Sequence, residues 1–221
     1  MDGVHRMFCF WVIWLLLKAC NSYNDIMKKM ILFGDSNTYG YDPRGFLGGR
    51  YPEDMIWPSL VRRELSNEFE IIEEGQNGRT LPLSSSLLFK RLVAETSSED
   101  YLVMMLGTND ILLVSNPNAV QPAIALEQIL SYVADNCKGH FIIIAPPYIS
   151  DIYPDLKPYH DCSVEMNSRF LNIAEHYNIP AFDAGTWDIP MGSDGVHFSV
   201  EGHKLFAQKF LESFNSLHCS L

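Results

Sequence analysis

Residues Ile31-Leu32-Phe33-Gly34-Asp35-Ser36-Asn37-Thr38 decide how this chain folds. Three apolar side chains are followed at once by a glycine, an acid and a serine. A short apolar run that ends in turn-forming residues is typical of a strand buried on both faces. The stretch therefore predicts a buried strand and a tight turn that presents the Ser36 hydroxyl. A serine in that position is a candidate nucleophile only where a base and an oxyanion site lie nearby.

Four more apolar runs alternate with five helical patterns along the rest of the chain. The apolar runs span 70–74, 101–106, 141–145 and 179–182. The helical patterns, with apolar residues spaced by three and four, span 59–68, 84–95, 122–136, 163–177 and 199–216. Alternation of this kind produces a parallel sheet with right-handed crossovers. We therefore predict an α/β fold, a single-domain three-layer α/β/α sandwich with a five-stranded parallel sheet.

The composition is that of a globular protein with one full core. Of the 221 residues, 47% are hydrophobic and 19% are charged. The net charge of -11 argues against nucleic acid or an anionic membrane surface as the main partner, because both attract basic patches. The five cysteines lack the paired spacing of a disulfide framework or a zinc site, and we expect ordinary thiols.

The first 29 residues are set apart from the predicted domain, which spans 30–221. Residues 8–17 form an apolar run that is short for a bilayer span and fits the core of a signal peptide. An acidic residue ahead of the run weakens the positive charge expected there. Translation from near Met27 or Met30 would give a cytoplasmic protein, whereas residues 1–20 would export or lipid-anchor it. The charge pattern favours the first alternative.

Four polar turns are expected to meet at one edge of the sheet. They contain Ser36, residues 75–80, residues 107–110 and residues 194–197. In an open parallel sheet, ligands bind beyond the carboxyl ends of the strands. Each turn alone is weak evidence, because glycine-containing polar turns often follow strands simply to change the chain direction. Their joint presence predicts one functional site at that edge.

The residues of these turns resemble the SGNH (GDSL-type) hydrolase superfamily. Its four blocks occur in order as Gly34-Asp35-Ser36-Asn37, Gly78, Gly107-Thr108-Asn109-Asp110 and Asp194-x-x-His197. The similarity spans about residues 30–214; residues 69–75, 78–80, 104–110 and 182–185 are most similar to the bacterial arylesterase/acyltransferase-like branch. The resemblance implies the flavodoxin-like SGNH hydrolase fold and a serine esterase that needs no cofactor and no metal.

Three side chains are predicted to carry the chemistry. Ser36 is the expected nucleophile, and His197 is the base that takes its proton and later protonates the leaving alkoxide. Asp194, three residues before the histidine, is expected to hold the other ring nitrogen. Asp183 is the rival acid. The structural alternatives are a helix N-cap for the serine and an ordinary turn for the aspartate and the glycine that follows it.

The predicted oxyanion hole has three donors. They are the backbone N–H groups of Ser36 and Gly78 and the side-chain amide of Asn109. Alternatively, the asparagine bonds only its own loop and the glycine only permits a turn. Asp35 is expected to order the turn through backbone hydrogen bonds. His203 is expected to be structural. A metal site formed by it with His197 and Asp194 is disfavoured, because that site needs the residues of the triad and lacks a clear ligand set.

The substrate side is less specific. Residues 39–57 and 146–159 are aromatic loops that suit a lid or a pocket wall, although an ordered surface loop is the alternative for the first. Trp57, Asp110 and Trp187 are predicted to contact the substrate. Aromatic walls suit short acyl or aryl esters and sugar esters equally well.

We therefore predict a serine ester hydrolase that works through an acyl-enzyme. The expected partner is a small acyl ester, aryl ester or acetylated carbohydrate, and transfer of the acyl group to an alcohol could use the same residues. Alternatives are a thioesterase or lysophospholipase for longer acyl chains and a non-catalytic ligand-binding module. A membrane is not expected as a core requirement. Homo-oligomers are common in the similar branch, but nothing in this sequence indicates one directly.

Overall fold

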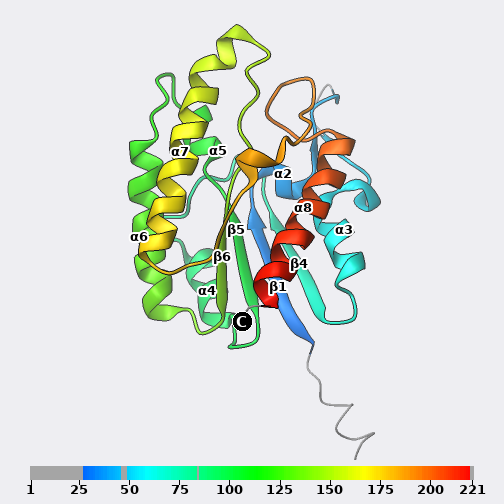
Figure 1. The fold of residues 1–221 in the computed structure, drawn as a ribbon, viewed down its shortest axis with the longest axis vertical. Coiled ribbons are helices and arrows are strands. Elements are labelled where there is room, and N and C mark those ends of the chain that lie inside the picture. Colours follow the sequence, from blue (N-terminus) through cyan, green and yellow to red (C-terminus); the bar gives the residue numbers. More distant parts are fainter. Residues whose placement is uncertain (1–26, 46–48, 84, 220–221) are drawn as a thin grey trace, which may run out of the picture.

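The computed structural model describes residues 27–45, 49–83 and 85–219, so the interpretation of the first 26 residues lies outside the described part. Five parallel strands form the central sheet in the order β4-β1-β5-β6-β7 (Figure 1). These strands are β1 (Lys28–Gly34), β4 (Phe69–Gly75), β5 (Tyr101–Met105), β6 (His140–Ala145) and β7 (Ala181–Asp183). The predicted five-stranded parallel sheet is confirmed.

Helices cover both faces of the sheet. One layer contains α4 (Leu87–Glu95), α6 (Val120–Asn136) and α7 (Lys157–His176), and the other contains α3 (Trp57–Glu64) and α8 (Val200–His218) (Figure 1). The predicted α/β/α sandwich is therefore confirmed as well. Among the described residues, none of the helices is both long enough and apolar enough to cross a membrane.

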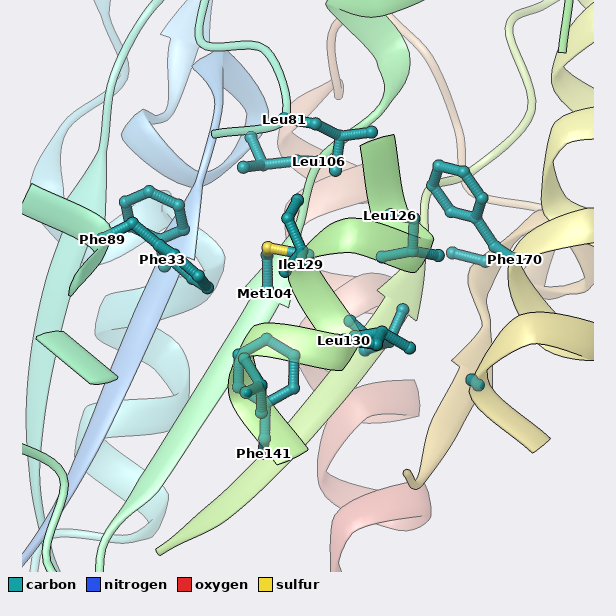
Figure 2. Close-up of a cluster of buried hydrophobic side chains, with 14 of the residues drawn as sticks. Phe33, Leu81, Phe89, Met104, Leu106, Leu126, Ile129, Leu130, Phe141 and Phe170 are labelled. Atoms are coloured by element: carbon teal, nitrogen blue, oxygen red, sulfur yellow. The ribbon is translucent and has the colours of Figure 1, made fainter. Parts of the chain in front are cut away.

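Alternate residues of β1 supply the two cores. Ile31 and Phe33 point into the α4/α6/α7 layer, where Figure 2 shows Phe33 among side chains from several helices and strands. Met30 and Leu32 point into the α3/α8 layer. This division follows from the two-residue period of a strand, and it explains why β1 is apolar at successive positions.

The strand register brings the ends of three strands level. Gly34 of β1 pairs with Gly75 of β4 and with Met105 of β5. The turns that follow these strands therefore leave the sheet side by side. This is the edge at which the sequence predicts the functional site.

Short elements are where the structure departs from the prediction. These are α2 (Ser36–Tyr39), α5 (Thr108–Leu112), the hairpin of β2 (Tyr41–Asp42) and β3 (Gly49–Arg50), and the 3-10 turns η1 (Glu53–Met55), η2 (Pro154–Leu156) and η3 (Ala184–Trp187). A helix of one turn is too short to display an apolar period, so the sequence pattern gives no signal for it.

Candidate active site

The turn after β1 holds Ser36 at the first position of α2. Asp35 caps this short helix, and its Oδ1 accepts a hydrogen bond from the Asn37 N–H at 2.9 Å. Gly40 ends the helix with a φ of +83°, a left-handed conformation that glycine adopts without strain. The predicted ordering role of Asp35 is confirmed, because its side chain is buried and bonds the backbone of the turn.

A continuous line of hydrogen bonds joins Asp194, His197 and Ser36. The Asp194 Oδ2 lies 2.6 Å from His197 Nδ1, and His197 Nε2 lies 2.9 Å from Ser36 Oγ. The nucleophile candidate and the histidine are 161 residues apart in the sequence. The fold therefore assembles the three predicted side chains with the connectivity of a catalytic triad.

The environment keeps the Asp194 carboxylate charged. Its partial burial would raise its pKa, but hydrogen bonds from the His197 ring and from the N–H groups of His197 and Val196 outweigh burial. Its pKa therefore lies below the ordinary value. A negative charge at this place fixes the ring tautomer and stabilises the imidazolium that forms when the histidine takes a proton.

An aromatic ring covers one side of the histidine. Tyr41, in the short β2–β3 hairpin, lies with its ring centroid 4.4 Å from that of His197, at 46° between the ring planes. Part of the aromatic loop predicted over residues 39–57 thus reaches the site. The Tyr41 ring therefore covers part of the imidazole on that side.

The predicted oxyanion residues lie in the turns after β4 and β5. Gly78 is exposed, has a φ of +72° and faces open space on the side where a Cβ would stand. Asn109 donates one amide hydrogen to the Arg79 carbonyl at 3.0 Å. Because an asparagine amide has two hydrogens, the loop bond leaves the second available to a substrate oxygen. The N–H of Ser36 is in the first turn of α2, where a helix offers it no backbone acceptor.

Arg79 fastens this turn to the sheet. Its Nη1 donates to the Gly34 carbonyl at 2.9 Å and also to the Glu74 carbonyl, and its guanidinium lies 4.3 Å from the centre of the Phe33 ring. Burial lowers the pKa of this arginine. This role of Arg79 was not predicted, because nothing local in the sequence indicates that its guanidinium turns back to the ends of two strands.

The three side chains predicted to contact the substrate lie in different environments. Trp57 is only 1% exposed and packs on Phe206 and Phe210 in the α3/α8 core, so this prediction is wrong. Trp187 is half-buried and packs on the same Phe206. Asp110 accepts a hydrogen bond from the Leu81 N–H at 3.0 Å, and burial raises its pKa to about 6. Substrate contact by Trp187 and Asp110 stays a prediction.

Asp183, the alternative acid, and His203, the alternative metal ligand, have hydrogen-bond partners other than His197. The Asp183 carboxylate accepts hydrogen bonds from Asn167 and from the Gly185 N–H. His203 is fully buried, and its Nδ1 accepts a hydrogen bond from the backbone N–H of Trp57 at 3.4 Å. Within the described ranges, no group of three or more His, Cys, Asp or Glu side chains is arranged to hold a metal ion.

Solved structures with the same architecture include two esterases. The aryl esterase of M. smegmatis is 23% identical, with a TM-score of 0.75, and the match covers 86% of this chain and 99% of that one. A carbohydrate acetylesterase from Sinorhizobium meliloti is 22% identical, with a TM-score of 0.72 over the same shares. At these identities the likeness shows the shared fold. A search of curated proteins gave no match.

The sequence profile of the GDSL-like lipase/acylhydrolase family matches residues 32–205. This range contains Ser36, Gly78, Asn109, Asp194 and His197, so it includes all four of the blocks on which the SGNH resemblance was based. The match covers most of the chain and confirms that resemblance. The chain belongs to the GDSL-like lipase/acylhydrolase family and is, with that family, a carboxylic ester hydrolase.

Proposed function

We propose that Ser36, His197 and Asp194 are the catalytic triad of a serine esterase that forms an acyl-enzyme. The observation that carries the proposal is the line of two hydrogen bonds, 2.6 Å and 2.9 Å long, from the Asp194 carboxylate through the His197 ring to Ser36 Oγ. Serine is a weak nucleophile at neutral pH and needs a base at hydrogen-bond distance, which His197 supplies.

In the acylation step, Ser36 Oγ attacks the ester carbonyl carbon while His197 Nε2 takes the hydroxyl proton. The carbonyl oxygen becomes an oxyanion, which accepts hydrogen bonds from the N–H groups of Ser36 and Gly78 and from the free amide hydrogen of Asn109. The intermediate collapses when the imidazolium gives its proton to the leaving alkoxide. An alcohol departs and the acyl group stays on the serine.

Deacylation repeats these steps with water as the nucleophile. His197 takes a proton from the water, the new oxyanion occupies the same hole, and the carboxylic acid leaves as the serine regains its proton. An alcohol that takes the place of water receives the acyl group instead. Transfer between esters and alcohols therefore needs no residue beyond those used for hydrolysis.

A small, uncharged ester is the substrate that the site supports best. The aryl esterase and carbohydrate acetylesterase that share the fold act, by their names, on esters of this kind. Tyr41 lies on His197, and an aromatic side chain at this place suits an aryl or sugar leaving group. The net charge of -11 repels polyanionic substrates, which disfavours acyl-coenzyme A thioesters.

Exposed apolar side chains favour a second candidate, hydrolysis of longer acyl chains. Leu83 is 74% exposed and Leu113 is 68% exposed. They follow the Gly78–Leu81 turn and the short helix of Asn109, which are joined through Asp110 and the Leu81 N–H. An acyl chain that leaves the site on this side would find apolar surface there.

The test is hydrolysis of p-nitrophenyl acetate, butyrate and octanoate by the full chain and by Ser36→Ala. We expect the wild type to prefer the shorter esters, and the variant to lose activity by at least about 10³-fold with an unchanged melting temperature. Preference for octanoate would favour the second candidate. Wild-type protein that is inactive on all three esters and on acetylated sugars would contradict the proposed function.

A further inference from the structure

The residue after the nucleophile has no part in the mechanism, yet it is built into the site. The chain reads Gly34-Asp35-Ser36-Asn37, whereas the family name carries Leu in the fourth place. The Asn37 side chain is only 5% exposed. A buried amide is stable only where its donor and acceptor atoms have partners, so its contacts reveal what it holds.

Both ends of the Asn37 amide bond the backbone that carries the histidine. The Nδ2 donates to the Val196 carbonyl at 3.2 Å, and Oδ1 accepts from the Phe198 N–H at 2.9 Å. These two groups belong to the residues immediately before and after His197. The amide orientation is unambiguous, because the reversed orientation would set donor against donor and acceptor against acceptor.

Asn37 is itself fixed in place. Its backbone N–H donates to Asp35 Oδ1 at 2.9 Å, and it lies in α2 directly behind the nucleophile. One planar side chain therefore links the turn of Ser36 to the loop of His197. Among the described residues, the hydrogen bonds between the 35–40 and 191–198 segments are these two and the Ser36–His197 bond itself.

The loop that carries the histidine is internally rigid but is otherwise tied elsewhere. The Asp194 carboxylate bonds the Val196 and His197 N–H groups as well as the ring. The Gly195 carbonyl accepts from the Ser150 N–H at 2.8 Å, in the loop after β6. Asp194 and His197 thus move together as one unit. Of the hydrogen bonds that tie this unit to the turn of Ser36, the two from Asn37 are the ones that do not involve the Ser36 hydroxyl.

We propose that Asn37 is a positioning residue that sets the distance between Ser36 Oγ and His197 Nε2. The proposal rests on the proposed function, since it treats the serine and the histidine as nucleophile and base. Asp194 and Asn37 then have different roles. Asp194 orients the His197 ring, and Asn37 places the oriented ring against Ser36. Leucine at this position could make neither bond.

Kinetics of Asn37→Ala and Asn37→Asp test this assignment. We expect Asn37→Ala to lower kcat for p-nitrophenyl acetate by about 10- to 100-fold with little change in KM, because a small misplacement of catalytic groups costs rate more than binding. The Asn37→Asp side chain keeps an acceptor for the Phe198 N–H but sets its second carboxylate oxygen against the Val196 carbonyl, so we expect kcat to fall in this variant as well. Asn167→Ala is the matched control, because it removes an equally buried amide that bonds Pro146 and Asp183 instead. It should lower the melting temperature and leave kcat within about twofold.

Two measurements distinguish a misplaced Asp194–His197 pair from a pair whose own hydrogen bond is lost. The low-field ¹H resonance of the His197 Nδ1 proton should persist in Asn37→Ala, since the Asp194–His197 pair stays intact. Amide exchange at Phe198 should become faster in Asn37→Ala and stay slow in Asn37→Asp. Folded Asn37→Ala with wild-type kcat, loss of the low-field resonance, or unchanged exchange at Phe198 would each overturn the proposal.

The same readouts keep the two proposals apart. A wild-type protein that cleaves no ester contradicts the proposed function, while exchange at Phe198 and the low-field resonance still decide whether Asn37 holds the loop. Conversely, an active wild type with an equally active Asn37→Ala overturns the positioning role and leaves the esterase assignment standing.

Discussion

Asp194 makes three hydrogen bonds with its two carboxylate oxygens, and all three hold the segment of His197. Asp194→Asn keeps the size of the side chain but replaces the charged oxygen that faces His197 Nδ1 with an amide N–H donor. Because the pKa of Asp194 lies below its ordinary value, the native group is charged throughout the neutral range. We expect Asp194→Asn to lower kcat by about 10³- to 10⁴-fold, since the ring loses its correct tautomer. Stopped-flow measurement of the p-nitrophenolate burst gives the acylation rate directly.

Asp194→Ala completes this test. Near-normal activity in this variant would mean that Asp183 or a backbone carbonyl orients His197. In the structure, Asp183 is engaged with Asn167 and Gly185, so we expect no such rescue. A double variant that also carries Asp183→Asn should be no slower than Asp194→Ala alone.

The residues proposed as the triad could be selected from the sequence because these residue types seldom occur together in such turns. Asp194 and His197 are close in the chain, and Ser36 follows a recognisable strand. Trp57 could not be placed correctly, because an aromatic residue near a loop gives no local sign of whether it faces the site or the core. The contacts of Asn37 depend on residues about 160 positions away, so no local pattern could reveal them.

Among the elements, the turn after β4 depends most on one side chain. Arg79 bonds carbonyls at the ends of β1 and β4, and its own carbonyl holds the Asn109 amide. We expect Arg79→Lys to lower kcat by about tenfold, because an ammonium group cannot span these acceptors and Gly78 loses its fixed position. Affinity for a boronic acid transition-state analogue should fall in parallel, while KM stays nearly constant.

Arg62→Lys is the matched control for this prediction. Arg62 also donates to a strand carbonyl, that of Ile71, but it lies on α3 and pairs with Glu53. Its replacement should leave both kcat and analogue affinity unchanged. If Arg79→Lys lowers stability but not analogue affinity, the arginine supports the fold and not the oxyanion turn.

The long elements could be predicted because burial imposes a period on them. Short apolar runs, most of them continuous, predicted the five strands of the central sheet, and spacing by three and four predicted α3, α4, α6, α7 and α8. Helix boundaries differ from the predicted ones where a capping residue sets them. For example, α4 begins after Ser86, whose side chain accepts a hydrogen bond from the Phe89 N–H. The short helices α2 and α5 are set by turns and by contacts between loops, so their existence depends on the tertiary structure.

At the scale of the whole molecule, one buried histidine makes stability depend on pH. Burial lowers the pKa of His203 to about 3, so the folded protein keeps it neutral. In the unfolded chain it takes up a proton below about pH 6.5. The unfolded state therefore binds more protons between these two values, and the free energy of unfolding falls as the pH decreases through this window, by at most about 1.4 kcal/mol per pH unit.

The pKa values of Asp35 and Asp110 act in the opposite direction. Burial raises both to about 6, so the folded protein binds these protons before the unfolded chain does, which adds stability as the pH falls from 6 towards 4. His203→Gln isolates the histidine. We expect the unfolding free energy of the variant, minus that of the wild type, to increase steadily from pH 7 to pH 4 in urea titrations. A difference that does not change with pH would contradict this account.

The positions of Ser36 and His197, the proposed nucleophile and base, have a consequence during synthesis. Ser36 follows the first strand and His197 follows the last, with every crossover of the sheet between them. A growing polypeptide therefore carries the proposed nucleophile long before it carries the proposed base. If these roles hold, the growing chain cannot cleave esters until nearly the whole domain has been synthesised and β7 and α8 have docked. Ester cleavage would then report completed folding, and a chain cut between Ser36 and His197 would lose activity once its halves separate.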